Sequence, residues 1–512
     1  MSEPTVAEDR TAPHRAGGAT DRHLAGLAAA VLQPGFVGAT PPDWVRRWLA
    51  DGLGGVVLFA RNIVDPGQLA ALTATLRAER PDVLVAIDEE AGDVTRIESA
   101  RGSSRPGNLA LGAVDDPGLT EEVARDLGAE LAALGVTLNY APDADVNNNP
   151  ANPVIGVRSF GADPGLVARH TAAWVRGLQS AGVAACAKHF PGHGDTRVDS
   201  HHELPRITAD RAALDAGELA PFRAAVAAGV QAVMTGHLLV PALDPELPAT
   251  LSRWILGDLL RDELGFSGVV VTDAVEMRAV ADRYGFRGAA VRALAAGADA
   301  ICVGGERADE AAAGQLRDAI VAAVRDGTLP EERLAEAAKR VGQLAAWAVS
   351  ARAARPARGL ASTGDSAIGL LAARRAVRVR GDRAALPLAG PPHVVEFVAP
   401  RNIAIGSETP WGIGAPLAGL LPGTTTVRLA ETDPPADPVA GAGGRPVVLV
   451  VRDLHRHAWM RAAVARALAA RPDAVVVELG LPELVTGRAH LATHGATRAS
   501  ARAAAELLAG HH

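Results

Sequence analysis

One loop of this chain carries more chemically reactive side chains than a surface loop requires. It reads Lys-His-Phe-Pro-Gly-His-Gly-Asp-Thr over residues 188–196 and Asp-Ser-His-His-Glu-Leu-Pro over residues 199–205. An apolar run at residues 183–187 precedes the loop and is typical of a buried strand. Glycine and proline account for a shaped loop, but they do not account for four histidines and two aspartates at the end of such a strand.

These residue types allow three interpretations of the loop. His201 lies two residues after Asp199, and an imidazole oriented by a carboxylate is an acid/base pair. Histidine and aspartate are also good ligands for a metal ion. A polar surface loop whose histidines are incidental is the third interpretation. The loop by itself does not decide among them, so the elements that position it have to be considered.

Composition limits the classes of protein and of partner. The chain has 512 residues, of which 48% are hydrophobic and only 3% aromatic. This length favours more than one domain, with cores built mostly from Ala, Val and Leu. The net charge of −7 is modest and not clustered, which argues against nucleic acid as a partner.

The sequence also predicts a compartment. Cys186 and Cys302 both lie in apolar, strand-like runs and are expected to be buried thiols, which fits a reducing environment. Residues 1–23 are polar and lack the apolar core of a secretory signal, so they are expected to form a disordered arm. No long apolar stretch free of charges predicts a membrane span. The expected location is the cytoplasm.

Residues 24–350 alternate short apolar runs with longer amphipathic stretches. Eight apolar runs separated by helical patterns predict a (β/α)8 barrel of the TIM type, and a doubly wound sheet is the structural alternative. The helical pattern at residues 164–181 has Asp163 as its expected N-cap and Pro164 in its first turn. The apolar runs are residues 27–32, 55–59, 83–87, 136–140, 183–187, 232–235, 269–272 and 300–303.

Residues able to do chemistry follow several of these runs. Barrel enzymes place their active sites at the carboxyl ends of the strands, so such residues are expected to share one rim. This clustering favours the catalytic interpretation of the loop. The residues at predicted strand ends are Asp88, Asn139, Asp143, Lys188, His189, His237 and Asp273.

A second unit is expected after the barrel. Residues 351–370 are rich in Ala, Arg and Pro in their first half and are expected to be a linker. Residues 371–512 then predict a small three-layer α/β domain, with helices at residues 458–469 and 500–508. Its strand-like runs are residues 376–379, 393–398, 424–429, 447–451 and 474–479.

The loop at residues 188–196, together with Asp199-Ser200-His201, closely resembles the signature of glycoside hydrolase family 3 in its β-N-acetylglucosaminidase branch. Further motifs resemble that family in order along the whole barrel. The resemblance is weaker over residues 371–512, where some members carry a second domain. The further motifs are residues 58–62, 87–90, 152–161, 234–237, 248–252 and 271–273.

The resemblance implies a retaining mechanism without a metal or other cofactor. Asp273 matches the nucleophile, His201 the general acid/base, and Asp199 the residue that holds His201. A carboxylate must attack the anomeric carbon while a second group protonates the leaving oxygen. A histidine, which titrates near neutrality, can transfer this proton in either direction. Five residues match sugar-binding positions: Asp88, Arg96, Arg158, Lys188 and His189.

Two features depart from the family pattern. Ala91-Gly92 replaces the usual pair of glycines after the acidic unit at residues 88–90, and Asp93 stands where a basic residue is common. His202 lies next to His201, so either imidazole could face the substrate. A metal-dependent barrel hydrolase is disfavoured, because those enzymes usually have a His-x-His motif after the first strand and residues 31–37 contain none.

The sequence is consistent with three functions. The first is release of terminal β-linked N-acetylglucosamine from small saccharides, with cell-wall muropeptides as the expected substrates. The second is a phosphorylase that uses inorganic phosphate as the acceptor, and the third is a family 3 β-glucosidase. In the second domain, residues 402–411 are expected to lean toward the barrel mouth, with Trp411 either stacking on a sugar or packing internally.

Overall fold

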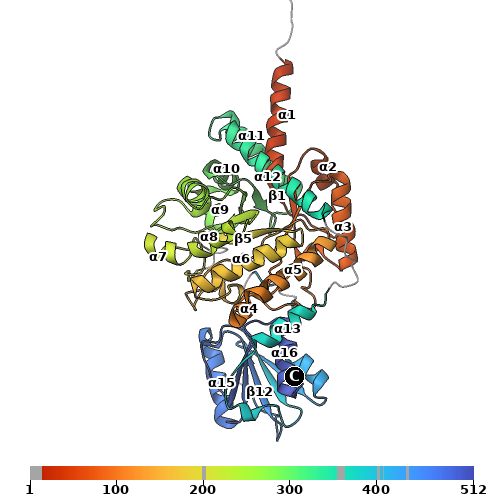
Figure 1. The fold of residues 1–512 in the computed structure, drawn as a ribbon, viewed down its shortest axis with the longest axis vertical. Coiled ribbons are helices and arrows are strands. Elements are labelled where there is room, and N and C mark those ends of the chain that lie inside the picture. The colour runs from red at the N-terminus through yellow and green to blue at the C-terminus, as the bar shows by residue number, and fades with distance from the viewer. Residues whose placement is uncertain are drawn as a thin grey trace, which may run out of the picture.

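The computed structural model describes residues 14–198, 203–354, 364–400, 404–406, 409–433 and 437–511. Figure 1 shows two units stacked along the long axis, with the strand β12 and the helices α15 and α16 in the smaller one. The larger unit ends with helix α12 (Glu331–Ala353), and the smaller unit begins with helix α13 (Ala367–Ala376). Residues 355–363 of the predicted linker lie outside the described residues.

The larger unit is the predicted eight-stranded barrel. Strands β2 to β7 form one parallel sheet in sequence order, and β1 pairs with β8. A bridge between Val271 and Ala300 joins β7 to β8, and the Gly54 N–H donates to the Ala29 carbonyl at 3.1 Å beside β1 and β2. The strands are β1 (Leu32–Pro34), β2 (Gly55–Leu58), β3 (Leu84–Ile87), β4 (Leu138–Asn139), β5 (Ala184–Phe190), β6 (Ala232–Thr235), β7 (Val269–Thr272) and β8 (Ile301–Val303).

The first strand lies later in the chain than predicted. The apolar run at residues 27–32 ends helix α1 (His14–Ala30) before it enters β1. Leu24 and Ala28 are buried one helical turn apart, where α1 packs on the helices α11 and α12. A buried helical stripe and a buried strand give similar apolar runs, which is why the pattern misled. Residues 14–23, assigned above to a disordered arm, belong to this helix.

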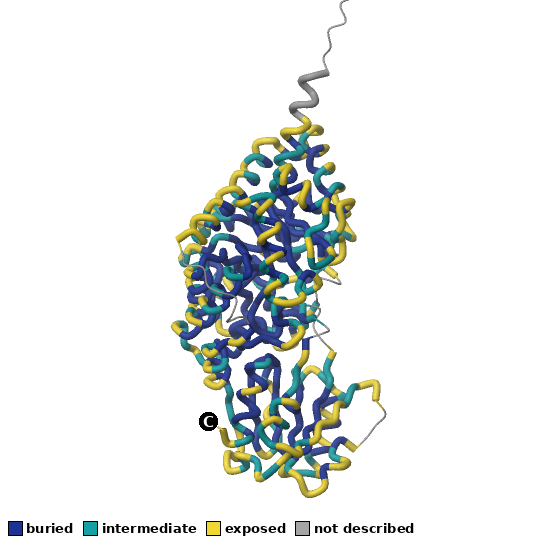
Figure 2. The backbone as a smooth tube through the Cα atoms, turned by 90° about the vertical axis from the view of Figure 1, so that its right-hand side faces the viewer, coloured by how far each residue is buried: buried dark blue, intermediate teal, exposed yellow. Residues whose placement is uncertain are grey.

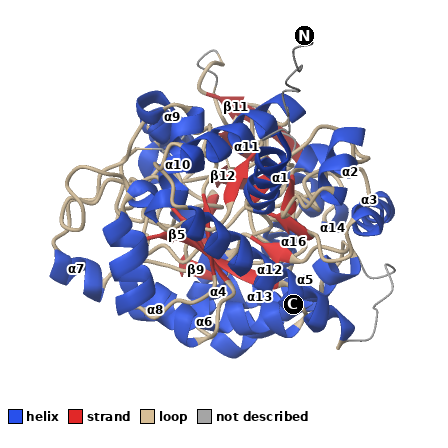
Figure 3. Cartoon of the chain, turned by 90° about the horizontal axis from the view of Figure 1, so that it is seen from above, coloured by secondary structure: helices blue, strands red, loops and turns tan. Residues whose placement is uncertain are grey.

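Helices surround the strands, as Figure 3 shows in the view from above. Three of them begin with Asp-Pro-Gly: the aspartates Asp65, Asp116 and Asp163 each accept the backbone N–H three residues later, and the proline sits in the first turn. The helical stretch after β5 is broken at Gly217 into α7 (Arg211–Ala216) and α8 (Leu219–Ala227). The remaining barrel helices are α2 (Asp43–Ala50), α3 (Pro66–Glu79), α4 (Asn108–Val114), α5 (Pro117–Ala133), α6 (Pro164–Ser180), α7 (Arg211–Ala216), α8 (Leu219–Ala227), a π-helical segment (Trp254–Glu263), α9 (Arg278–Tyr284), α10 (Phe286–Ala296) and α11 (Glu310–Arg325).

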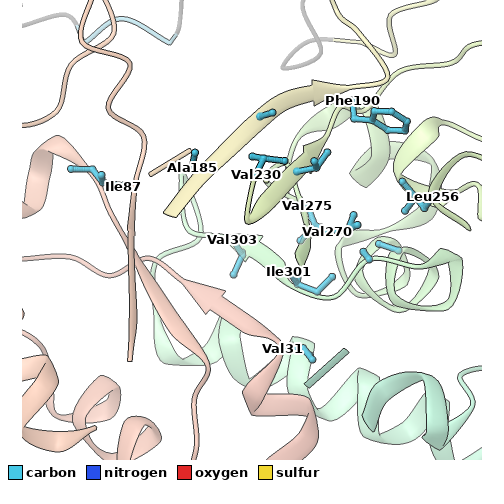
Figure 4. Close-up of a cluster of buried hydrophobic side chains, with 14 of the residues drawn as sticks. Val31, Ile87, Ala185, Phe190, Val230, Leu256, Val270, Val275, Ile301 and Val303 are labelled. Atoms are coloured by element: carbon cyan, nitrogen blue, oxygen red, sulfur yellow. The ribbon is translucent and has the colours of Figure 1, made fainter. Parts of the chain in front are cut away.

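Alternate strand residues serve two different cores. Figure 2 shows that the backbone through the centre of the larger unit is buried. Residues such as Ile87 and Ala185 face outward to the helices, and Figure 4 shows part of this cluster. Their neighbours, such as Ala86 and Cys186, fill the barrel together with side chains of α12. Cys186 and Cys302 are free and buried in this inner core, as predicted.

The smaller unit is the predicted three-layer α/β domain. Its sheet has the order β11-β10-β12-β13-β14-β9, parallel except for β9, and strand β14 was not predicted. Helices α14 and α16 cover one face of the sheet and α15 the other. The elements are β9 (Arg378–Gly381), β10 (His393–Val398), α14 (Gly414–Leu420), β11 (Thr425–Ala430), β12 (Val447–Val451), α15 (Ala458–Ala470), β13 (Val475–Glu478), β14 (Ala489–Ala492) and α16 (Arg498–Ala509).

The lengths and apolar content of the helices bear on membrane association. In the described part of the chain, none of them combines the length and the apolar character that crossing a bilayer demands.

Candidate active site

A cavity of about 620 Å³ opens at the carboxyl ends of the barrel strands. Side chains from strand ends all around the barrel line it, which is the usual place for a barrel active site. The predicted acid/base residues His201 and Asp199, and the neighbouring His202, lie outside the described residues. All the other predicted site residues line this one cavity: Asp88, Arg96, Arg158, Lys188, His189 and Asp273.

A buried ion-pair network forms one wall of the cavity. The Lys188 ammonium contacts a carboxylate oxygen of Asp88 and lies 2.7 Å from Glu90 Oε1. The Arg158 guanidinium donates to both oxygens of Glu90, at 2.9 and 2.8 Å. Glu90 therefore holds two predicted sugar-binding cations at once. The sequence motif at residues 87–90 contained this residue, but no role was predicted for it.

The charges in this network keep one another ionised. Burial alone would lower the pKa of Lys188, but the carboxylates of Asp88 and Glu90 outweigh it and raise that pKa. Burial would likewise raise the pKa of Glu90, but Arg158 and Lys188 hold it well below its usual range. The wall is therefore a set of fixed charges, which can orient sugar hydroxyls without rearranging.

Arg96 connects this wall to the second domain. One guanidinium nitrogen lies 3.1 Å from Asp88 Oδ2, and another donates to the Ala404 carbonyl at 3.0 Å. Ala404 and Gly406 follow β10 and line the cavity. In a doubly wound sheet, ligands bind beyond the carboxyl ends of strands where the strand order reverses, and β10 and β12 flank such a point here. The carboxyl ends of β10 and β12, where ligands bind in doubly wound sheets, thus face the barrel mouth.

Trp411 takes the packing role of the two that were considered. It does not appear among the described residues that line the cavity. It packs partly buried against the core of the second domain, with the Arg428 guanidinium carbon 5.3 Å from its ring centroid. Among the described residues of the segment 402–411, Ala404 and Gly406 line the cavity.

A second buried group orients His189. The His189 ring nitrogen Nδ1 lies 2.7 Å from Asp145 Oδ2, and the backbone N–H groups of His189 and His193 donate to Asp145 Oδ1 at 3.2 and 2.6 Å. Burial lowers the pKa of His193 to about 4, so its ring is neutral near pH 7. With Nδ1 committed to Asp145, His189 presents its Nε2 edge to the cavity.

The metal interpretation does not fit the described residues. Asp143, Asp145 and His189 bring ligand atoms within 4.8 Å of one another. However, an Arg158 guanidinium nitrogen lies 3.7 Å from Asp143 Oδ2, where it would repel a cation. Burial and the charge of Asp145 raise the pKa of Asp143 well above its usual range, so Asp143 favours its neutral form. The cluster is already compensated by Arg158 and His189, which disfavours a metal ion there.

Asp273 directly follows strand β7 and is half-buried at the cavity surface. Its N–H donates to the Thr235 carbonyl at 3.1 Å, and its Oδ1 accepts the Ala274 N–H at 2.8 Å.

Two other residues at strand ends have structural roles. The His237 ring is buried, with one nitrogen 2.9 Å from the Thr250 hydroxyl and the other 3.0 Å from the Ala274 carbonyl. His237 therefore supports the turn that carries Asp273. Asn139 also has a structural role, since its side chain bonds the backbone of Glu89.

Glu276 is a cavity residue that the sequence reasoning missed. One carboxylate oxygen accepts the N–H groups of Gly304 and Gly305 at 2.8 and 2.7 Å, and the other is buried without a hydrogen-bond partner among the described residues. Burial raises the pKa of Glu276. A buried, unpaired oxygen beside Asp273 is suited to bind a polar group of the substrate. The only sequence signal was its position three residues after the predicted nucleophile.

The unusual Asp93 has a partner in the second domain. Its carboxylate lies 2.6 Å from an Arg452 guanidinium nitrogen and accepts the Ala496 N–H at 2.8 Å. Both side chains are largely buried where β12 and β14 end. The acidic residue that departs from the family pattern is therefore explained by the interface between the two units.

We expect Arg452→Ala to lower the free energy of unfolding by about 3 kcal/mol, because the substitution leaves the buried Asp93 carboxylate without its cation. Urea denaturation measures this change. Arg471→Ala, which removes a more exposed pair with Asp473, is the matched control and should cost less than about 1 kcal/mol. Equal losses of unfolding free energy in the two variants would contradict a special role for the interface pair. The double variant with Asp93→Asn and Arg452→Ala should recover part of the stability that Arg452→Ala loses.

Comparison with known proteins agrees with this geometry. Residues 29–344 match the glycosyl hydrolase family 3 N-terminal domain. Beta-hexosaminidase A of Pseudoalteromonas piscicida is 36% identical over 328 residues, which are 59% of this chain and 55% of that protein. The chain thus spans about half the length of that relative. The beta-hexosaminidase of Alkalilimnicola ehrlichii is 40% identical over 255 residues, which are 49% of this chain and 73% of that protein.

A solved structure extends the similarity to the second domain. The glycoside hydrolase family 3 beta-N-acetylglucosaminidase from Paenibacillus sp. str. FPU-7 is 37% identical, with a TM-score of 0.85. The match covers 95% of this chain and 97% of that one, so it includes both units. The family match over the barrel and the ring of matching residues around one cavity lead to a single conclusion: this chain belongs to glycosyl hydrolase family 3, a family of hydrolases that act on glycosidic bonds.

Proposed function

We propose that this protein is a retaining exo-β-N-acetylglucosaminidase that releases terminal β-linked N-acetylglucosamine from small saccharides. The observation that carries the proposal is that Asp273 shares one cavity with all five predicted sugar-binding residues. These residues are Asp88, Arg96, Arg158, Lys188 and His189, and they come from three segments of the barrel: the connections after β3 and β4, and the end of β5. The names of the relatives, beta-hexosaminidase and beta-N-acetylglucosaminidase, point to the same activity.

In the first step of the proposed mechanism, an Asp273 carboxylate oxygen attacks the anomeric carbon and forms a glycosyl ester. The bond to the leaving oxygen breaks, and protonated His201 supplies the proton that this oxygen takes up. Asp199 holds the His201 ring and stabilises its charge. In the second step, neutral His201 removes a proton from water, the water oxygen attacks the anomeric carbon, and Asp273 leaves as a carboxylate.

The paired charges of the cavity wall support the binding half of this proposal. Asp88 accepts from Lys188 and Arg96 and still presents carboxylate oxygens to the cavity, which suits sugar hydroxyl donors. Lys188, Arg158 and the Nε2 edge of His189 offer groups to hydroxyl oxygens. Because each is fixed by a carboxylate, the wall is preorganised for a single sugar orientation.

We include a substrate class and a compartment in the proposal. Cell-wall muropeptide fragments are the expected substrates, as the resemblance to the branch implied. Two free, buried thiols are in keeping with the reducing cytoplasm.

His201→Ala tests the acid/base assignment. We expect its turnover to fall by about 10²–10⁴-fold on substrates with poor leaving groups, and much less on activated aryl glycosides, because only the former need protonation. Asp199→Ala should show a milder version of the same pattern, and His202→Ala is the neighbouring control. Initial rates on a disaccharide and on a nitrophenyl glycoside measure the difference. Equal losses on both substrates would assign His201 to binding or folding instead.

A second candidate function is phosphorolysis, which the histidine acid/base favours. A carboxylate acid/base would be anionic when the acceptor arrives, and at about 4 Å it would repel phosphate by roughly 4 kcal/mol at an effective dielectric of about 20. Neutral His201 imposes no such repulsion. The cations Lys188, Arg158 and Arg96 give less help than their number suggests, because Asp88 and Glu90 pair with them. Hydrolysis therefore remains the first proposal.

Product analysis on an aryl N-acetyl-β-glucosaminide, from zero to tens of millimolar phosphate at fixed ionic strength, separates these functions. We expect free N-acetylglucosamine at a rate independent of phosphate. Formation of N-acetylglucosamine 1-phosphate with a rising rate would replace hydrolysis by phosphorolysis. The corresponding aryl β-glucoside tests the third function, β-glucosidase, whose acid/base usually comes from the second domain. Among the described residues of that domain, Ala404 and Gly406 line the cavity, and neither transfers a proton.

A further inference from the structure

A second cavity of about 600 Å³ lies in the smaller unit, away from the active site. It is bounded by the end of helix α13, strand β9 and helix α16. Figure 1 shows α13 and α16 near the junction of the two units. We call this cavity the arginine groove. None of its lining residues belongs to the catalytic cavity.

The arginine groove carries a strong positive charge. Four arginines line it, at positions 374, 378, 380 and 383, and Glu506 is the single carboxylate among its lining residues. Arg374 pairs with Glu506 at 2.7 Å, and Arg378 donates to the backbone carbonyls of Arg375 and Ala113. Within the described part of the chain, Arg380 and Arg383 make no ion pair. Two guanidinium groups thus remain available to an anionic ligand.

The groove follows the free edge of the sheet. Strand β9 is the last strand, antiparallel to β14, and no described strand pairs with its other edge. Successive side chains of a strand point to opposite faces, yet Arg378, Val379 and Arg380 all line the groove. A cavity that touches three successive residues must lie along the edge of the strand, where the backbone is also accessible. Unpaired backbone N–H and C=O groups at such an edge can pair with another strand.

We propose that the arginine groove binds an extended acidic peptide, which adds to the sheet as a strand beside β9. Strand addition explains both features of the groove, because the edge supplies backbone hydrogen bonds and the arginines supply charge complementarity. This proposal is independent of the glycosidase activity.

The alternation of β9 specifies the pattern of the peptide. Val379 of the strand packs on the same core cluster as Leu507, and Val377, which directly precedes the strand, packs beside Ala503. These four apolar side chains line the groove and form its floor. Arg378 and Arg380 lie on the face of the strand opposite Val379. A strand paired with β9 places its own side chains alternately on the same two faces. The expected ligand therefore alternates apolar and acidic residues, whereas a simple phosphate chain would leave the apolar floor unused.

The competing explanation is that the arginines only protect the edge. Charged side chains on edge strands discourage unwanted pairing between chains. On that explanation the groove has no ligand, and substitution of its arginines would promote aggregation without loss of any binding.

Fluorescence anisotropy with a labelled hexapeptide of alternating valine and glutamate tests the proposal, using the full-length protein at low salt. We expect saturable binding that weakens about tenfold or more in the variant with Arg380→Glu and Arg383→Glu, since two attractive pairs become repulsive. Arg466→Glu, an exposed arginine on α15 across the sheet, is the matched control and should bind like the unsubstituted protein. Unchanged glycosidase activity shows that each variant is folded.

Two further probes separate strand addition from charge alone. The same peptide with alternate backbone amides methylated keeps its charge but cannot form the strand hydrogen bonds, so we expect its binding to be lost. Equal binding of the methylated peptide, or of inorganic tripolyphosphate, would overturn strand addition and leave a general polyanion site. Absence of binding up to millimolar peptide would overturn the proposal in favour of edge protection.

Discussion

Asp273→Ala is expected to abolish glycoside turnover, with kcat lower by about 10⁴-fold or more, while the protein remains folded. In the proposed mechanism the Asp273 carboxylate forms the glycosyl ester, and this substitution removes it. The cost in stability should be less than about 1 kcal/mol, because the side chain is only half-buried and the backbone bond from residue 273 to Thr235 is retained. Initial rates and urea denaturation measure the two quantities.

Azide makes this test specific for a nucleophile. In the Asp273→Ala variant the space vacated by the carboxylate should admit azide, which attacks an activated β-glycoside from the same side and gives an α-glycosyl azide. A mechanism-based fluorosugar should label Asp273 in the unsubstituted protein, as peptide mass spectrometry would detect. Labelling of another residue, or turnover near normal in the variant, would refute the assignment.

Glu90→Gln is expected to have the largest effect on stability, a loss of about 3–5 kcal/mol. Glu90 is buried and compensates both Arg158 and Lys188, which are themselves buried. The substitution keeps the shape of the side chain but leaves two cations with one carboxylate fewer. Activity should also fall by about 10²-fold, because the two cations lose the group that positions them in the cavity.

A surface pair provides the comparison for Glu90. Glu79 pairs with Arg46 at 2.6 Å, and both side chains are partly exposed. Glu79→Gln should cost less than about 1 kcal/mol and should leave activity unchanged. If both variants lost equally little stability in urea denaturation, the buried network would not have the importance that its geometry indicates.

The second domain contacts the wall of the cavity, so its position is expected to affect substrate binding as well as stability. The carboxyl ends of its strands face the barrel mouth, and Arg96 bonds the Ala404 carbonyl there at 3.0 Å. Arg96 also contacts Asp88, so the wall of the cavity and the domain interface share a residue. Substitutions that loosen the interface, such as Arg452→Ala, are therefore expected to affect substrate binding as well as stability.

Local signals in the sequence were enough to predict the architecture. Strand β6 lies at the residues predicted, because a short apolar run flanked by helical patterns is read from neighbouring positions alone. Asp163 and Pro164 start helix α6 for the same reason, since capping depends on the next three residues. The errors are also local. The run at residues 27–32 mixes a buried helical stripe with a strand, and the strand β14, Ala-His-Leu-Ala, has no β-branched residue and a polar histidine within it.

The sequence pattern of apolar runs and helices predicted the barrel, and the barrel in turn predicted which site residues share one rim. Once eight strands were assigned, Asp88, Lys188 and Asp273 had to lie at one end of the barrel, because parallel strands share their carboxyl ends. The roles of His201 and Asp199 came from the resemblance of the loop to the family and remain predictions.

The partners of the site residues were decided only by the tertiary structure. The sequence placed Lys188 and Arg158 in the site, but it did not show that Glu90, far away along the chain, compensates both. Pairing of buried charges depends on which strand ends become neighbours and on how deeply each side chain is buried, and neither is a local property. For the same reason Glu276 became visible only when the N–H groups of Gly304 and Gly305 were found on one of its oxygens. Asp93 looked like a departure from the family until the folded chain placed Arg452 beside it.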